Sequence, residues 1–337
     1  MYGIIQGDFP QVAGGGERAD GRYKAQAVRE RTMAAVFLIA ACVSVVAVVA
    51  ICLFLLANGV PAMAEIGVAD FLLGMRWRPL EGKFGIFPMI VGSLLVTAGA
   101  LVVGVPLGLL CAVFLARFCP PKSYRLLKPA VDLMAGIPSI VYGFFGLMVI
   151  VPSIRQLVGG SGKGMLTAGI LLGIMILPTI ISVAEAAIRG VPAGYFEGSL
   201  ALGATKERSV FFAELPAAKT GIMAGIVLGL GRAMGETMAV VMICGNQSVL
   251  PRNLADGVRT LTANIVLEMG YATDLHRGAL IATAVVLFCF ILIINLLLSM
   301  MKRRVGVCFN GLLSGFEPTV GSPFRWLCGW QCYCRWP

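Results

Sequence analysis

Two ionisable residues inside an apolar stretch are the strongest candidates for chemistry in this chain. Arg232 lies eleven residues into a predicted helix over 221–245, roughly 16 Å along it, and therefore near the middle of a membrane. Glu236 would lie one turn further along the same face. An ionisable side chain at that depth costs about 2.5–3.5 kcal/mol and is a candidate for function. Because a guanidinium can donate bidentate hydrogen bonds to an oxyanion, Arg232 could contact an anionic substrate while Glu236 orients it.

An alternative gives the same two residues a structural role. Arg232 and Glu236 could neutralise each other as an i,i+4 pair, or each could pair with a partner on another helix. Arg before Glu is the weaker order for a pair within one helix, which favours partners elsewhere. The residue types and their spacing leave both interpretations open.

The composition predicts the elements that must position these residues. Hydrophobic residues make up 58% of the 337 and charged residues only 13%, against about 25% charged in soluble domains, so a polytopic membrane protein is expected. Crossing a core of about 30 Å takes about 20 apolar residues, and backbone groups in lipid must be satisfied within the segment, which predicts helices. The expected fold class is all-α, with six transmembrane helices near 33–57, 86–115, 130–151, 166–187, 221–245 and 279–301.

The distribution of Lys and Arg predicts the orientation. Loops on the side of the N-terminus hold sixteen basic residues and the alternate loops hold eight. The positive-inside rule therefore places both termini and the loop 188–219 in the cytoplasm. The net charge of +10 is explained as a topology signal, so no nucleic-acid partner is expected. The ten cysteines form no ligand set with a histidine, so the chain is expected to bind no metal and no cofactor itself.

The sequence also predicts how the chain is divided, and it suggests roles for two residues in the loops predicted to lie outside the cytoplasm. Trp77 suits an interfacial anchor or an ordinary packed aromatic, and His276 is expected to be solvated. The first helix is interpreted as a retained signal anchor. The predicted divisions are a cytoplasmic arm over 1–32, the first helix over 33–57, an outside loop over 58–85, a helical core over 86–304, and a tail over 305–337 that is expected to be unstructured.

The helix that carries Arg232 also carries glycines at four-residue intervals. Gly221, Gly225 and Gly229 fall on one face, where small residues let helix backbones approach closely. This spacing predicts that the helix is buried among other helices.

A polar segment, EGSLALGATKERSVFFAELP at 197–216, lies between apolar spans of membrane length. A short helix is expected over 193–202, ended by Gly203 in a left-handed turn. Thr205 can cap a second helix, and Leu215-Pro216 returns the chain to the membrane. Such a helix–turn–helix could dock on another protein, or it could be an amphipathic loop at the membrane surface.

This segment resembles the signature loop of ATP-binding-cassette importer permeases, E-A-A-x3-G-x9-I-x-L-P. Further segments, namely WRP at 77–79, KFGIFPMIVGSLLVT at 83–97, GIPSIVYGFFG at 136–146 and GLGRAMGETMAV at 229–240, resemble the C-type permease of phosphate-specific transport systems. Glu197, Gly203, Leu215 and Pro216 are in register with the signature, whereas Gly198, Ser199 and Ala213 replace its two alanines and its isoleucine with small or apolar residues.

The resemblance implies a type I importer permease fold and several partners. These are an A-type permease, a cytoplasmic ATPase dimer that binds ATP and Mg²⁺, and a periplasmic phosphate-binding protein, with membrane lipid around the spans. It implies that Glu197, Gly203, Leu215 and Pro216, within a coupling loop over 191–216, act in ATPase coupling, and that Arg232 and Glu236 act in phosphate passage. The chain itself would then not be an enzyme.

Other interpretations remain open. The substrate could be another small oxyanion, because selectivity would lie largely in the delivering protein. A self-sufficient anion channel or secondary transporter would leave the signature loop without a purpose. A membrane-embedded enzyme would need a nucleophile or metal set, and the sequence offers only the Arg/Glu pair.

Overall fold

The computed structural model describes residues 16–314, with side chains described for 29–296 and for Met300. In this part of the chain the fold is helical apart from one two-stranded hairpin. Six helices are long and apolar enough to cross a membrane, which confirms the expected all-α, multi-pass architecture. The six spans are Arg29–Ile66, Phe87–Phe118, Ser139–Val158, Met165–Arg189, Lys206–Gly235 and Asp274–Leu296.

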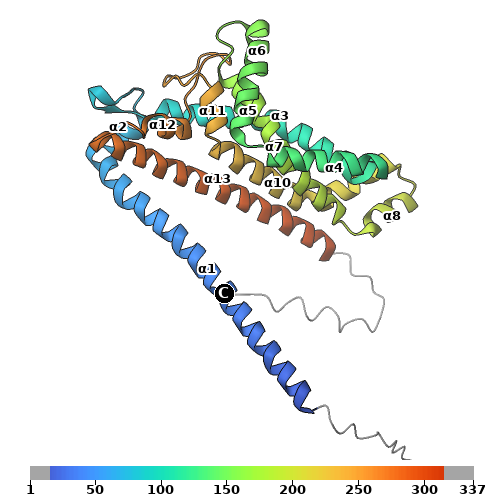
Figure 1. Ribbon diagram of the computed structural model, residues 1–337. Helices are drawn as coiled ribbons and strands as arrows, with labels where there is room; N and C mark the ends of the chain where they lie inside the picture. The colour runs from blue at the N-terminus through green and yellow to red at the C-terminus, as the bar shows by residue number, and fades with distance from the viewer. Residues whose placement is uncertain (1–15, 315–337) are drawn as a thin grey trace, which may run out of the picture.

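The elements follow one another along the chain with short connections, apart from the longer loop 244–260 between α11 and α12 (Figure 1). The hairpin pairs β1 (Trp77–Arg78) with β2 (Lys83–Phe84) around a short 3-10 turn, η1 (Pro79–Glu81). The helices are α1 (Gly16–Ile66), α2 (Val68–Leu73), α3 (Phe87–Val113), α4 (Pro121–Gly136), α5 (Ser139–Phe145), α6 (Val151–Val158), α7 (Met165–Arg189), α8 (Ala193–Ala201), α9 (Lys206–Ser209), α10 (Leu215–Gly235), α11 (Met238–Ile243), α12 (Leu261–Glu268) and α13 (Asp274–Ser314), with π-helical turns η2 (Phe114–Phe118), η3 (Gly146–Ile150) and η4 (Val210–Glu214).

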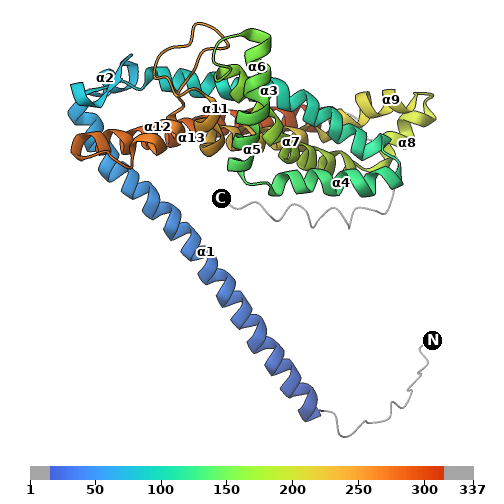
Figure 2. The ribbon, with the colours of Figure 1, turned by 45° about the horizontal axis from the view of Figure 1, so that its top comes forward.

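Helix α7 is the centre of the bundle. It packs along α3 on one side and along α10 on another, and α4 also lies against it. Figure 1 and Figure 2 show α8 and α9 at one end of this body and the hairpin region with α2 at the other. These two ends are called the α8 end and the hairpin end below.

The close approach of α3 and α7 depends on glycine. A Cβ atom on Gly104 would lie 2.7 Å from the Ile176 side chain, and one on Gly173 would lie 2.9 Å from Val103. Real Cβ contacts are longer than this, so the two backbones could not approach so closely with larger residues at these positions. The resulting interface forms the main buried apolar cluster, which includes Leu171, Met175 and Ile176.

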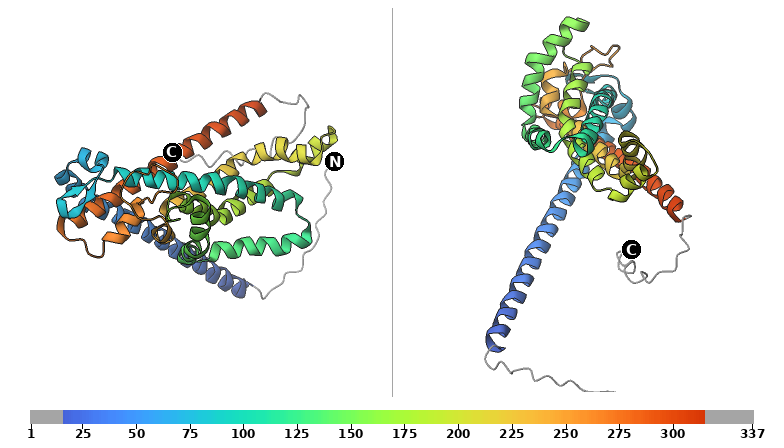
Figure 3. Two further views of the ribbon diagram at one scale, coloured as in Figure 1. Left: turned by 90° about the horizontal axis from the view of Figure 1, so that it is seen from above. Right: turned by 90° about the vertical axis from the view of Figure 1, so that its right-hand side faces the viewer.

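Helix α1 differs from the other spans because its apolar stretch is exposed along its length. It packs against α13, and the right panel of Figure 3 shows its N-terminal part standing apart from the body. The helix begins at Gly16 and continues to Ile66, so it is longer at both ends than the first span predicted near 33–57. On the N-terminal side the polar segment 16–32 is also helical, and on the C-terminal side the helix continues through Pro61.

The third span, predicted near 130–151, is present but lies further along the chain, at Ser139–Val158. Helix α4 ends at Gly136, Ile137 is extended with φ −69° and ψ 127°, and the span starts only at Ser139. The cause is Pro138, which disfavours helical geometry in the residue before it and donates no backbone hydrogen bond.

The predicted fifth span, 221–245, starts too late and ends too late. The helical segment runs from Lys206 through Leu215-Pro216 without a break and ends at Gly235. Pro216 directly follows the π-helical turn η4, where the regular backbone hydrogen-bond pattern is already interrupted, so the helix accommodates a residue that has no N–H. Helix α13 likewise continues to Ser314, which overturns the expectation of an unstructured chain for 305–314; residues 315–337 lie outside the described part.

Candidate functional site

Arg232 lies near the end of α10, three residues before Gly235. Its half-buried side chain donates a hydrogen bond from Nη1 to Thr179 Oγ1 on α7, at 3.3 Å. Among the described side chains, no carboxylate lies within ion-pair distance of Arg232. Its distance along the helix also differs from the sequence estimate, because the helix begins long before residue 221.

Other half-buried basic side chains on the described helices form ion pairs with carboxylates. Arg117 Nη2 lies 2.6 Å from Glu214 Oε1, and Lys128 Nζ lies 3.2 Å from Glu185 Oε2. Burial opposes the charged form of Lys128, but its bonds to Glu185 and Asp132 outweigh this effect and raise its pKa. The Arg232 guanidinium, by contrast, hydrogen-bonds a neutral hydroxyl and forms no ion pair with a described carboxylate. A partly desolvated charge of this kind favours an anion as its missing partner.

Glu236 does not share a helix face with Arg232, so that expectation is wrong. The helix stops at Gly235, and Glu236 is extended with φ −69° and ψ 131°. Its Oε1 accepts a hydrogen bond from the Ala239 N–H at 3.2 Å, and its carbonyl accepts one from Thr262 Oγ1 at 3.0 Å. Glu236 therefore holds the connection between α10 and α11 and anchors it to α12.

A small polar cavity lies beside this connection. Its accessible volume is about 10 Å³, roughly the minimum for one water molecule and too small for a tetrahedral oxyanion. It is lined by Glu236, by the hydroxyl residues Ser93, Thr97, Thr260 and Thr262, and by Val96, Leu172, Ala233, Met234 and Val240. Four hydroxyl side chains, from α3 and the start of α12, thus line a cavity beside the break between α10 and α11.

The glycines of α10 lie against α7. A Cβ on Gly221 would be 2.4 Å from Ala187 Cβ, one on Gly225 would be 3.2 Å from Val183 Cβ, and one on Gly229 would be 3.0 Å from Ile180 Cγ1. These contacts fix α10 closely on α7, and with it the position of Arg232 relative to Thr179.

At the α8 end, the chain forms the helix–turn–helix that the sequence predicts. Helix α8 ends just before Gly203, whose φ of +85° is left-handed, and Thr205 Oγ1 accepts the Arg208 N–H at 3.4 Å. Glu197 and Gly203 are exposed. Two apolar side chains also project from this end, since Leu202 is 91% exposed and Phe212 is 77% exposed.

Leu215 and Pro216 lie at the start of α10, where the surface helices join the span. Leu215 is half-buried against an apolar cluster that includes Ile188 and Val210, whereas Pro216 is exposed. Glu197 and Gly203 are therefore available to another protein, and Leu215 is mostly committed to the bundle.

At the hairpin end, the structure reveals a polar cluster that sequence reasoning missed. Buried Glu268 accepts hydrogen bonds from Trp77 Nε1 at 2.7 Å and Arg259 Nη1 at 2.6 Å, and its Oε2 lies 2.9 Å from His276 Nε2. The expectation of a solvated His276 is wrong, and Trp77 is a packed aromatic. No local pattern signals this cluster, because its members come from separate loops and helices.

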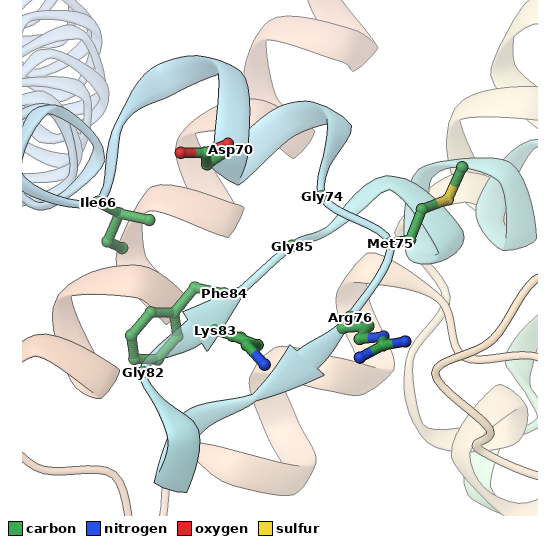
Figure 4. Close-up of a pocket in the computed structure, with 9 residues that line it drawn as sticks. All are labelled: Ile66, Asp70, Gly74, Met75, Arg76, Gly82, Lys83, Phe84 and Gly85. Atoms are coloured by element: carbon green, nitrogen blue, oxygen red, sulfur yellow. The ribbon is translucent and has the colours of Figure 1, made fainter.

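An open hollow of about 400 Å³ lies beside the hairpin (Figure 4). Figure 4 shows Asp70 on one rim and Lys83 and Arg76 on the other. Both basic side chains are exposed. This hollow is separate from Arg232, which faces α7.

The chain is similar in sequence to known transport permeases. A family model described as "binding-protein-dependent transport system inner membrane component" matches residues 104–307. The chain is 39% identical over 276 residues to a "probable ABC transporter permease protein YqgH" of Bacillus subtilis, covering 79% of this chain and 89% of that protein. It is 34% identical to the phosphate transport system permease protein PstC of Mesorhizobium japonicum, covering 76% and 84%.

A solved structure of a bacterial alginate ABC transporter, in complex with alginate pentasaccharide-bound periplasmic protein, contains a chain of similar fold. The TM-score is 0.51 at 17% identity, over 72% of this chain and 85% of that chain. This likeness concerns the fold.

Proposed function

We propose that this chain, which belongs to the family of binding-protein-dependent transport system inner membrane components, is the C-type permease subunit of an ATP-driven importer of inorganic phosphate. The observation that carries the proposal is the half-buried guanidinium of Arg232, whose hydrogen bond to Thr179 is its only one with a described residue. A planar guanidinium suits bidentate contact with phosphate oxygens. Relatives named as phosphate transport permeases support the same substrate.

Arg232 would contact phosphate as it passes between α7 and α10. Glu236 would act indirectly, because it holds the α10–α11 connection rather than the guanidinium. Broken helices are a common place for substrate sites in transporters, since freed backbone groups can line a cavity there. The small hydroxyl-lined cavity at this break would have to widen before an oxyanion could enter it.

The orientation follows from the basic residues. The α8 end and both termini would lie in the cytoplasm and the hairpin end outside, in a bacterial cytoplasmic membrane. The exposed apolar side chains of α1 would contact membrane lipid or the A-type permease that completes a heterodimer. The phosphate-binding protein would deliver its cargo at the hairpin end.

The ATPase would dock on the α8 end. Exposed Glu197 and Leu202 supply a charged and an apolar contact there, and the left-handed turn at Gly203 fixes the angle between α8 and α9. ATP and Mg²⁺ would be bound by that partner and not by this chain.

The complete transporter in vesicles tests the transport function. Phosphate uptake should require the A-type permease, the ATPase, ATP, and phosphate-loaded binding protein. Uptake without ATP would instead identify a channel or a secondary transporter. Equal uptake of sulfate, delivered by its own binding protein, would remove the assignment to phosphate.

Two leucine variants test the docking surface. Leu202→Asp should lower the amount of ATPase that co-purifies with the permease by about tenfold or more, because it places a charge in an apolar contact. Leu80→Asp is a matched control at the opposite end, since Leu80 is 104% exposed at the hairpin tip, and it should leave co-purification unchanged. Equal effects of the two variants would contradict docking at the α8 end.

A further inference from the structure

Arg117 contacts three elements at the α8 end. It lies in η2, and its Nη2 is 2.6 Å from Glu214 Oε1 on η4. The same nitrogen donates a hydrogen bond to the Ile188 carbonyl of α7 at 3.4 Å. Its guanidinium also lies over the ring of Phe196 on α8, 5.9 Å from the centroid. One side chain thus joins the surface helix α8 to two membrane-spanning segments.

The ion pair is unusual because it is buried and incompletely satisfied. Glu214 is fully buried and lies among apolar side chains such as Val210 and Ala218. Arg117 Nη2 contacts only Oε1 of this carboxylate, and Glu214 Oε2 and Arg117 Nε have no hydrogen-bond partner among the described residues. Replacing such a pair with apolar residues is often neutral or stabilising, so stability gives little reason for it.

The covalent route between α8 and α10 is indirect. From α8 the chain passes through the exposed turn around Gly203, then α9 and η4, before it enters α10. The side chains of Phe196, Arg117 and Glu214 connect α8 to the start of α10 by a shorter route than the backbone does. It reaches the chain directly before Leu215, at the start of the helix that carries Arg232.

We propose that Arg117 and Glu214 form a positioning pair that transmits movement of α8 to α10 and the spans around it. This inference rests on the proposed function, in which an ATPase moves α8. To transmit movement rigidly, contacts must fix both the distance and the relative orientation of α8 and α10. The Arg117–Glu214 pair can do so, because Arg117 also contacts the Phe196 ring and the Ile188 carbonyl. An apolar pair of the same size would fill the space without fixing the two helices in one register.

Phosphate imported per ATP hydrolysed, measured with the complete transporter in vesicles, tests this proposal. Arg117→Ala should lower the ratio by about tenfold, which corresponds to a coupling change within the range seen along such networks. Arg117→Met combined with Glu214→Leu removes the stranded carboxylate while keeping the volume. This double variant should assemble with the ATPase as well as wild type does, and its ratio should remain low. Arg125→Ala is the matched control, because Arg125 is exposed on α4 and forms no ion pair with any described residue.

The two proposals fail in different ways. If wild type and the Arg125 control do not import phosphate with ATP, the proposed function is wrong. If they do, and the apolar double variant regains the wild-type ratio, the pair is merely structural and the inference is overturned. An unchanged ratio for Arg117→Ala overturns it as well. Should Arg117→Ala fail to accumulate, the double variant decides the question alone.

Discussion

Glycine in α10 sets how closely this helix can approach α7, and alanine substitutions test this directly. At Gly221 a new Cβ would lie 2.4 Å from Ala187 Cβ, far inside the normal contact distance, and the nearest atom belongs to a side chain that cannot rotate away. Either the helices separate or Ala187 shifts with its backbone. Overpacking of this kind typically costs about 1–3 kcal/mol, so Gly221→Ala should lower the free energy of unfolding by that amount.

The same helix supplies the control. A Cβ on Gly231 would have no neighbour within 4 Å. Gly231→Ala should therefore be neutral, or should stabilise the helix by up to about 1 kcal/mol, because alanine loses less backbone entropy than glycine. The second control is Ala187→Gly combined with Gly221→Ala, which removes the clash while keeping the new methyl group.

Denaturant or thermal unfolding in detergent would measure these differences. The double variant should be less destabilised than the sum of the two single changes by about 1 kcal/mol or more, because the residues are in contact. If Gly231→Ala were as damaging as Gly221→Ala, or if the two effects at Gly221 and Ala187 simply added, close glycine packing would not determine the α7–α10 distance.

Three further predictions concern the ends of the bundle. Glu268→Ala should lower the free energy of unfolding by about 3 kcal/mol, because it strands the Arg259 charge; thermal unfolding measures this, and Glu81→Ala in an exposed ion pair should show no measurable loss. Thr205→Ala should speed hydrogen exchange of the following helical turn, reflecting about 1 kcal/mol of lost capping, and unchanged exchange would contradict the cap. Backbone N–H groups of Asn253 and Arg252 lower the pKa of Asp256 below its ordinary value, so its stabilisation of the loop 252–256 is complete above the ordinary, unfolded pKa and disappears as the pH falls through the lower folded pKa; hydrogen exchange against pH should show this, and Asp256→Asn should remove the dependence.

Local chemistry was sufficient to predict the α8 end. Pro192 begins a helix, Gly203 adopts the left-handed conformation that ends it, and Thr205 caps the next one. Each of these features depends on residues a few positions apart, so the sequence carries the whole signal. The same is true of the glycine face on α10, where four-residue spacing follows from helix geometry.

The features that were missed depend on contacts between distant segments. Glu236 belongs to a helical pattern by composition, yet its bonds to Ala239 and Thr262 hold it in the break that follows Gly235. Pro138 lies inside the span predicted near 130–151, whereas in the structure it separates two helices. Nothing near Arg117 in sequence indicates Glu214 as its partner.

Phosphate uptake by an Arg232 variant tests the central claim most directly. In vesicles that contain the complete transporter and phosphate-loaded binding protein, Arg232→Gln should lower ATP-dependent uptake about 100-fold, because it removes a partly desolvated charge from the proposed path of phosphate. Arg232→Lys should fall between this variant and wild type, since it keeps the charge but loses the planar fork. Arg155→Gln, at an exposed position on α6, should import phosphate at the wild-type rate. Wild-type uptake by Arg232→Gln in a fully assembled complex would contradict the account.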